Sequence, residues 1–111
     1  MLETILNKMT KNLKSNFIKE LYSIIESRAK SGKKNSYTKS LLKKGKKQIA
    51  QKIGEESSEL IIDYLAGSKQ RVIEESADLL YHLVLLLYSR KISIEDIQKE
   101  LNKRKKNVRS K

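Results

Sequence analysis

Apolar residues recur at spacings of three and four along most of the chain, which is the period of one face of an α-helix. In the first quarter of the sequence these positions are Ile5, Leu6, Met9, Leu13, Phe17, Leu21, Ile24 and Ile25. The stripe predicts a helix from about Lys14 to Ala29, which can extend back towards Thr4. The polar, glycine-containing stretch 31–36 predicts the loop that follows it.

A second helix is expected from near Thr38 to about Ala66, with an interruption or bend at Gly45. Gly67 comes directly after this helix. Because many helices end on a residue in the left-handed conformation, we expect Gly67 to be a left-handed cap. Ser68 is then a candidate N-cap for the next helix, since a serine oxygen can accept hydrogen bonds from the free N–H groups of a first turn.

The helix after Ser68 carries the strongest apolar stripe and should end near Arg90. Its apolar positions are Val72, Ile73, Leu79, Leu80, Leu83, Val84, Leu86 and Leu87. A final helix is predicted after Ser93, because Ser93 and Asp96 have the spacing of a capping box. The lysine-rich tail from Lys103 onwards has little apolar content, so we expect it to fray.

These elements predict an all-α fold: a single domain, 1–111, of four to five helices in an antiparallel bundle, with a frayed basic end at 105–111. The chain shows no strand pattern and no internal repeat, and it has no proline to break a helix. A chain of 111 residues is near the lower limit for burying an adequate core alone. The stripe before Arg90 is also wider than one partner helix covers. We therefore expect a homodimer that completes the bundle.

The chain contains no cysteine, which fits a reducing compartment. Apolar runs such as 83–87 are far shorter than the about 20 residues that a bilayer-spanning helix needs. The first residues include an acid, Glu3, and no small-residue cleavage site, so they do not resemble a signal peptide. We expect a cytoplasmic protein without a membrane partner.

Lysine and arginine total 25 against 13 acidic residues, a net charge of +12, which favours an anionic partner. Nucleic acid is one candidate. However, only five of these residues are arginines, the type that contacts bases and phosphates bidentately. An anionic small-molecule substrate explains the same charge. A basic helical nucleic-acid-binding protein is therefore kept as the alternative from another functional class.

The acidic residues of this basic chain are clustered. Seven of the 13 fall in one stretch, at Glu55, Glu56, Glu59, Asp63, Glu74, Glu75 and Asp78. Residues three or four apart lie on one helix face, so Glu56 and Glu59 project together, and so do Glu75 and Asp78. The loop at 67–68 is short, which predicts antiparallel helices. Glu59 and Glu75 are equally far from that loop, so the two pairs should meet.

Converging carboxylates repel one another, and burial disfavours their charged form. A hard cation would resolve that conflict. Oxygen-only ligands suit Mg²⁺ or Mn²⁺, whereas a chain with no cysteine and one histidine is a poor zinc site. Either motif alone is common on solvated helix faces. The matched pair, embedded in apolar residues, favours a metal site. His82 lies one turn after Asp78 on the same face. A lone histidine is most often half-buried and donates to a backbone group or a carboxylate; here it can also orient Asp78, which we favour, or contact a phosphate.

Three short segments resemble phosphoribosyl-ATP pyrophosphatase, a family within the all-α, MazG-type nucleotide pyrophosphatases. They are Ser-Tyr-Thr at 36–38, Lys-x-Gly-Glu-Glu at 52–56 and Ala-Asp-Leu-Leu-Tyr-His at 77–82. The resemblance extends over about 17–104. The carboxylate motif is shared by the whole superfamily, and the Ser-Tyr-Thr and Tyr-His elements select this member.

The resemblance implies hydrolysis of the α–β phosphoanhydride of phosphoribosyl-ATP to phosphoribosyl-AMP and pyrophosphate, the second step of histidine biosynthesis. It implies a magnesium site built from Glu56, Glu59, Glu75 and Asp78. Glu55 and Glu56 are the implied catalytic residues, with Glu55 a further ligand or the group that positions water. The candidate substrate-binding residues are Lys52, Lys44, Lys47, Arg28, Ser36, Tyr37, Thr38 and His82. The nearest alternative is a MazG-like nucleoside triphosphate pyrophosphatase that uses the same metal site.

Overall fold

The computed structural model describes residues 2–31 and 36–109, with side chains for 16–31 and 36–105. Five helices make up this part of the chain: α1 (Leu2–Lys30), α2 (Tyr37–Lys44), α3 (Lys46–Ala66), α4 (Lys69–Ser89) and α5 (Ile94–Arg109). No strand occurs among the described residues. The all-α prediction is therefore confirmed. Most of the loop predicted at 31–36 lies outside the described residues.

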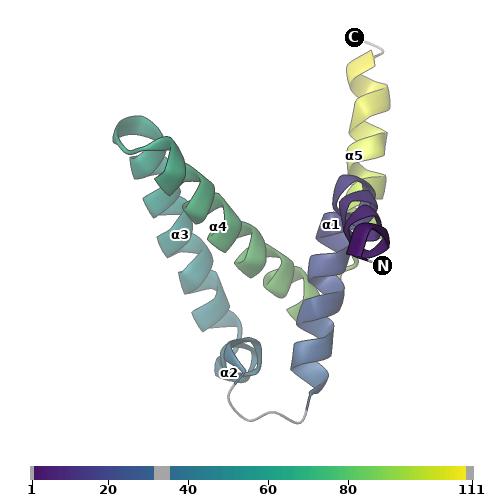
Figure 1. Ribbon diagram of the computed structural model, residues 1–111. Coiled ribbons are helices and arrows are strands. Elements are labelled where there is room, and N and C mark those ends of the chain that lie inside the picture. Colours follow the sequence, from purple (N-terminus) through teal and green to yellow (C-terminus); the bar gives the residue numbers. More distant parts are fainter. Residues whose placement is uncertain (1, 32–35, 110–111) are drawn as a thin grey trace.

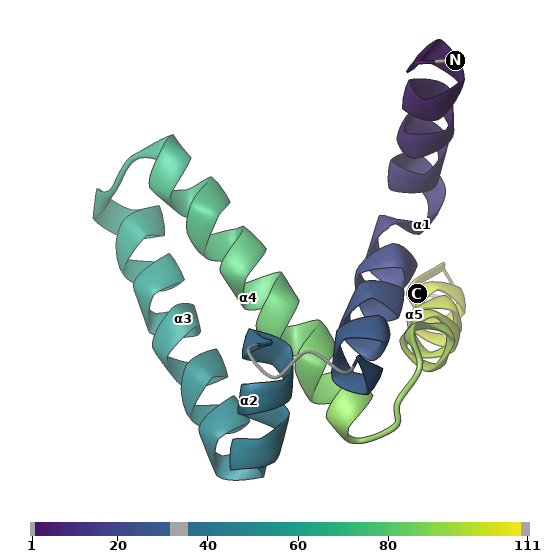
Figure 2. The same ribbon diagram turned by 60° about the horizontal axis from the view of Figure 1, so that its bottom comes forward.

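Helices α3 and α4 form an antiparallel hairpin, and they lie side by side in both views (Figures 1 and 2). The short α2 packs against α3 and α1 at the open end of this hairpin, while α1 packs along the C-terminal part of α4. Helix α5 turns back beside α1. No helix among the described residues has the length and apolar character needed to cross a membrane.

The buried core is small and lies where α1, α2, α3 and α4 meet. Its fully buried apolar residues are Ile25, Leu41, Ile49, Val84 and Leu85. Towards the loop end of the hairpin, large apolar side chains of α3 and α4 are exposed instead. They include Ile61, Ile62, Tyr64, Leu65 and Ile73.

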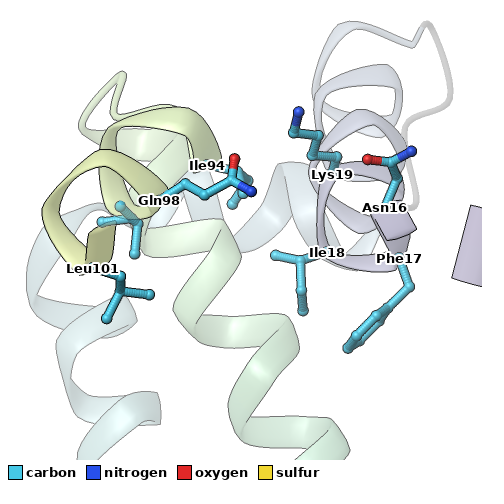
Figure 3. Close-up of a pocket in the computed structure, with 8 residues that line it drawn as sticks. Asn16, Phe17, Ile18, Lys19, Ile94, Gln98 and Leu101 are labelled. Atoms are coloured by element: carbon cyan, nitrogen blue, oxygen red, sulfur yellow. The ribbon is translucent and has the colours of Figure 1, made fainter. Parts of the chain in front are cut away.

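A separate hollow of about 300 Å³ lies between α1 and α5 (Figure 3). Apolar side chains such as Phe17 and Ile18 from α1 and Ile94 and Leu101 from α5 line it. None of the clustered acidic residues borders this hollow. The candidate chemistry is therefore to be sought on the α3–α4 hairpin.

Several predicted helix ends are confirmed by their capping contacts. Gly45 separates α2 from α3 and has a φ of 95°, a conformation that favours glycine. Ser68 is the N-cap of α4, and its side chain accepts a hydrogen bond from the Arg71 N–H at 3.1 Å. Ser93 and Asp96 form the predicted capping box, with two reciprocal hydrogen bonds of 3.1 Å each.

The left-handed cap predicted at Gly67 is wrong. Gly67 is extended, with φ −99° and ψ −170°, and its N–H donates to the Asp63 carbonyl at 2.8 Å. Ser68 is extended as well, so two extended residues reverse the chain directly into α4. A Cβ on Gly67 would lie 2.5 Å from Asp63 Oδ1 and 2.9 Å from Asp63 Cα. Glycine is needed here for close approach rather than for a positive φ.

Both terminal helices are longer than predicted. Helix α1 begins at Leu2 and changes direction at Asn16, whose φ of −144° and ψ of 21° are not helical. Helix α5 continues to Arg109, beyond the Lys103 at which fraying is expected, and that fraying stays a prediction. The tail has no glycine or proline to stop a helix, and Arg104 pairs with Glu100 one turn earlier at 3.1 Å. Residues 110–111 lie outside the described part.

Candidate active site

The hairpin brings the two predicted carboxylate pairs together. Glu59 of α3 and Glu75 of α4 come close enough for the Glu59 carboxyl group to act on the pKa of Glu75. Glu75 is only 3% exposed. Burial raises the pKa of Glu75 above its ordinary value, and the nearby Glu59 carboxyl group raises it further. Glu59 and Glu75, which are equally far from the loop in the sequence, thus come near each other across the hairpin, as predicted.

Glu56 is the second buried carboxylate, 8% exposed, and it lies one turn from Glu59 on α3. Burial raises its pKa, the neighbouring His82 ring lowers it, and the charge of Asp78 raises it. Asp78, on α4, is itself exposed. The four predicted metal ligands therefore differ in burial: Glu56 and Glu75 are buried, whereas Glu59 and Asp78 are exposed.

The His82 ring contacts Glu56 rather than the side chain of Asp78. Its Nδ1 lies against Glu56 Oε1 and also 2.9 Å from the backbone carbonyl of Asp78. Both neighbours are acceptors, so Nδ1 carries the proton and donates to the carbonyl. One ring hydrogen cannot satisfy both oxygens well, and Glu56 Oε1 is left buried without a hydrogen-bond partner. An unmatched carboxylate oxygen of this kind is suited to a cation.

The other ring nitrogen of His82 is held from helix α2. Tyr37 Oη lies 2.6 Å from His82 Nε2, and a neutral ring protonated at Nδ1 accepts this hydrogen bond. Thr38, fully buried, makes a parallel hydrogen bond to the Tyr81 hydroxyl. The Ser-Tyr-Thr and Tyr-His motifs therefore meet in space. His82 is 6% exposed, and both of its ring nitrogens lie against protein groups. Its role at the site stays a prediction.

Glu55 and Lys52 lie at the edge of the cluster. Lys52 Nζ is 3.8 Å from Glu55 Oε2, and Gln51 Nε2 donates to Glu55 Oε1 at 3.0 Å. Glu55 thus contacts polar neighbours on its own helix rather than the buried carboxylates. The charge of Lys52 lowers the pKa of Tyr37 against the larger effect of burial, which places the ammonium group near the hydroxyl. Lys52 thus pairs with Glu55 and has a charge that acts on Tyr37 of α2.

The remaining predicted substrate-binding residues make no hydrogen bond or ion pair with the clustered carboxylates in the described part of the chain. Ser36 caps α2 by accepting from the Lys39 N–H at 3.3 Å. Arg28, Lys44 and Lys47 are exposed near the ends of α1, α2 and α3. Lys47 precedes Glu56 by nine residues, about 13 Å along the helix axis. Their roles stay predictions.

Arg71 is a further residue of this cluster, and it is not among the predicted site residues. This residue of the first turn of α4 contacts Glu75 Oε1 at 2.6 Å, Glu74 Oε1 at 3.0 Å and Asp63 Oδ2 at 3.8 Å. Its spacing of three and four from Glu74 and Glu75 is a signal that the sequence contains. The contact to Asp63 crosses the hairpin loop and has no such signal.

The acidic side chains are close together but are not arranged as a ligand shell. Among the described residues, no three acidic or histidine groups are placed as they would be around a metal ion. Glu75 instead has the positively charged Arg71 as its partner, and Glu56 has the His82 ring against it. The oxygen donor set and the unmatched Glu56 Oε1 fit a hard divalent cation. Binding one would require the four carboxylates to rearrange from the positions described.

Comparison with known proteins bears on the same residues. The family described as phosphoribosyl-ATP pyrophosphohydrolase matches residues 18–105, which include all of α2, α3 and α4. The chain belongs to this family. The match agrees with the resemblance expected over about 17–104 and takes in all four predicted metal ligands.

Individual relatives lead to the same assignment. A phosphoribosyl-ATP pyrophosphatase of Sulfolobus acidocaldarius is 48% identical over 94 residues, which cover 85% of this chain and 99% of the relative. One of Clostridium novyi is 44% identical and covers 85% of this chain and 86% of the relative. A histidine biosynthesis bifunctional protein of Bacteroides thetaiotaomicron is 43% identical over 79% of this chain and 43% of its own length.

Proposed function

We propose that this chain hydrolyses the α–β phosphoanhydride of phosphoribosyl-ATP to phosphoribosyl-AMP and pyrophosphate, the second step of histidine biosynthesis. The observation that carries the proposal is the family match over the helices that hold the buried carboxylates. The names of the relatives point to the same substrate, and that of the bifunctional relative to the same pathway. The substrate is polyanionic, which agrees with the net charge of +12.

The proposal includes a Mg²⁺ ion, for which Mn²⁺ can substitute, held by Glu56, Glu59, Glu75 and Asp78. Two features support it: Glu59 is near enough to the buried Glu75 to raise its pKa, and the buried Glu56 Oε1 has no hydrogen-bond partner. When bound, such an ion would offset charge on the phosphates and make a bound water more acidic.

The residues around this site then have separable tasks. His82, fixed by Tyr37, sets the orientation of the Glu56 carboxylate. Lys52, which pairs with Glu55 at the edge of the cluster, would bind phosphates held near the carboxylates. Glu55, beside Lys52 and open to solvent, can accept a hydrogen bond from a water at the same edge.

A homodimer and a cytoplasmic location belong to the proposal as well. The exposed apolar side chains of the hairpin are more extensive than a small monomer usually leaves in water; they include Ile62, Tyr64 and Leu65, at 65%, 76% and 76% exposure. A second copy of the chain would cover them by a two-fold symmetric contact. Light scattering at micromolar concentration tests this, and a stable monomer would contradict it.

The test of the activity compares three substrates with one preparation of the protein. Purified chain is incubated with phosphoribosyl-ATP, ATP or dUTP, with and without Mg²⁺, and pyrophosphate release is measured. We expect Mg²⁺-dependent release from phosphoribosyl-ATP far above that from the other two. Comparable release from ATP or dUTP would favour a MazG-like pyrophosphatase of broad specificity. Absence of release, together with tight nucleic-acid binding at physiological salt, would overturn the proposal.

A further inference from the structure

Arg71 is placed inside the acidic cluster. Its guanidinium group reaches Glu75 at 2.6 Å and Glu74 at 3.0 Å from two different nitrogens, and its third nitrogen lies 3.8 Å from Asp63. The planar fork of arginine suits such a double contact, which a lysine cannot reproduce. In a chain whose basic residues are mostly lysine, this position uses the one side chain that can bridge several carboxylates.

The contact with Glu75 differs from an ordinary surface ion pair. The side chain of Glu75 is only 4% exposed, whereas that of Arg71 is 55% exposed. The guanidinium group therefore reaches from solvent onto a buried carboxylate. The α5 pair Arg104–Glu100 has the same spacing of four residues, but both side chains are more than half exposed, at 72% and 53%. Exposed pairs of that kind contribute little.

Arginine stays protonated at any pH that the fold tolerates, so Arg71 brings a permanent positive charge to the cluster. That charge offsets part of the repulsion between Glu75 and Glu59. A divalent cation bound by Glu75 would need the oxygen that now accepts from Arg71 and would be repelled by the guanidinium group. The two cations cannot both be close neighbours of Glu75 Oε1 without a cost.

We propose that Arg71 is an internal counter-ion that a divalent cation has to displace from Glu75, and that it thereby weakens and sets the affinity of the site for metal. This inference rests on the metal site of the proposed function. The displaced guanidinium group would still be anchored by Glu74 and Asp63, at the rim of the site. Arg71 is a positioning residue in this account, since it acts through Glu75.

The experiment measures Mg²⁺ and Mn²⁺ binding directly, by calorimetry on the full-length chain without substrate. The variants are Arg71→Gln, Arg71→Lys and the matched control Arg104→Gln. We expect Arg71→Gln to bind Mg²⁺ about tenfold more tightly, the size of the repulsion between a divalent and a monovalent cation about 6 Å apart in water-like surroundings. Arg71→Lys keeps the charge without the fork and should fall between the two. Arg104→Gln should bind like the unchanged chain.

A second readout separates competition from simple loss of structure. Without metal, Arg71→Gln should have a lower melting temperature than the unchanged chain, because a buried carboxylate loses its partner. With saturating Mg²⁺ the difference should shrink or reverse. The affinity difference should also shrink at about 1 M salt, where the Debye length is about 3 Å.

The outcomes are distinct. If the unchanged chain binds Mg²⁺ and Arg71→Gln binds equally or more weakly, the inference is overturned while the proposed function stands. Weaker binding in particular would mean that Arg71 orients Glu75 for the metal instead of competing with it. If neither the unchanged chain nor any variant binds Mg²⁺ or Mn²⁺, both the inference and the proposed metal site are overturned. Tighter binding by Arg71→Gln, with Arg104→Gln binding like the unchanged chain, supports the inference.

Discussion

Replacing Tyr37 with Phe tests whether helix α2 supports the buried carboxylates through His82. The change removes one hydroxyl group, whose oxygen lies 2.6 Å from His82 Nε2, and leaves the ring that packs edge-on against His82. His82 is 6% exposed, so its nitrogen would lose its partner in a nearly buried place. Tyr37 is 50% exposed, so water can reach part of the vacated space.

The burial of His82 and the partial exposure of Tyr37 determine how much stability the change should cost. A buried polar group left without a partner costs about 1–3 kcal/mol, and partial access of water favours the low end, about 1 kcal/mol. In a domain of this size such a loss lowers the melting temperature by about 5 °C. The larger consequence is functional. Partners that orient a metal ligand typically change metal affinity or activity about ten- to hundredfold.

The assay compares Tyr37→Phe with Tyr64→Phe, which removes the same group from a side chain that is 76% exposed. Urea denaturation measures the free energy of unfolding, and steady-state kinetics separate kcat from KM. We expect Tyr37→Phe to lower kcat and Mg²⁺ affinity, because Glu56 loses its fixed orientation. A rise in KM alone would assign Tyr37 to substrate contact. If Tyr37→Phe matched Tyr64→Phe in both stability and turnover, the proposed support of Glu56 through His82 would be refuted.

Further predictions concern the ligands, the basic residues and the hairpin loop. Amide variants of the four proposed ligands should each lower turnover at least about a hundredfold while circular dichroism shows retained helix, and near-normal activity in all four would contradict the site. These variants are Glu56→Gln, Glu59→Gln, Glu75→Gln and Asp78→Asn. Lys52→Ala should impair pyrophosphate release. Deleting the residues after Arg104 should leave pyrophosphate release intact and reduce any salt-sensitive binding of nucleic acid. The reverse pattern would contradict the assignment of Lys52, rather than the basic tail, to substrate binding. Gly67→Ala should lower the free energy of unfolding by about 1–3 kcal/mol, because the added Cβ would collide with Asp63. A Cβ added at Gly54 would meet no atom within 4 Å, so Gly54→Ala should raise the free energy of unfolding by about 0.5–1 kcal/mol.

Contacts between residues related by a helical period could be predicted from the sequence. Glu59 and Glu75 meet because each lies eight positions from Gly67 across a two-residue turn, and antiparallel helices preserve that register. The caps at Ser68 and Ser93 follow from spacings of three residues. In each case the relevant geometry is local, or is fixed by one short loop.

Contacts that depend on helix rotation or on the path of a loop could not be predicted in the same way. Whether His82 turns to Asp78 or to Glu56 depends on how α4 is rotated against α3, which no spacing encodes. Gly67 is extended because α4 begins only two residues later, a constraint visible only once both helices are placed. The reach of Arg71 across that loop to Asp63 depends on the same turn.

The raised pKa of Glu56 leads to a last prediction, that this residue lowers the stability of the metal-free protein at neutral pH. Burial and the charge of Asp78 place its pKa in the folded state above the ordinary value of 4.5. A carboxyl group whose pKa is raised by folding stabilises the folded state fully below the unfolded value and loses that contribution as pH rises through the folded value. Lowering the pH from 7 towards 4.5 should therefore stabilise the metal-free chain through Glu56.

Glu56→Gln should melt at a higher temperature than the unchanged chain at pH 7, and the difference should narrow as the pH falls. Saturating Mg²⁺ should raise the melting temperature of the unchanged chain more than that of the variant. The reason is that the ion supplies a positive charge next to the negatively charged Glu56 carboxylate. A variant less stable than the unchanged chain at pH 7 without metal would show that His82 already compensates the buried charge. A residue that destabilises the metal-free fold when ionised, and stabilises it when metal binds, has the behaviour expected of a functional residue.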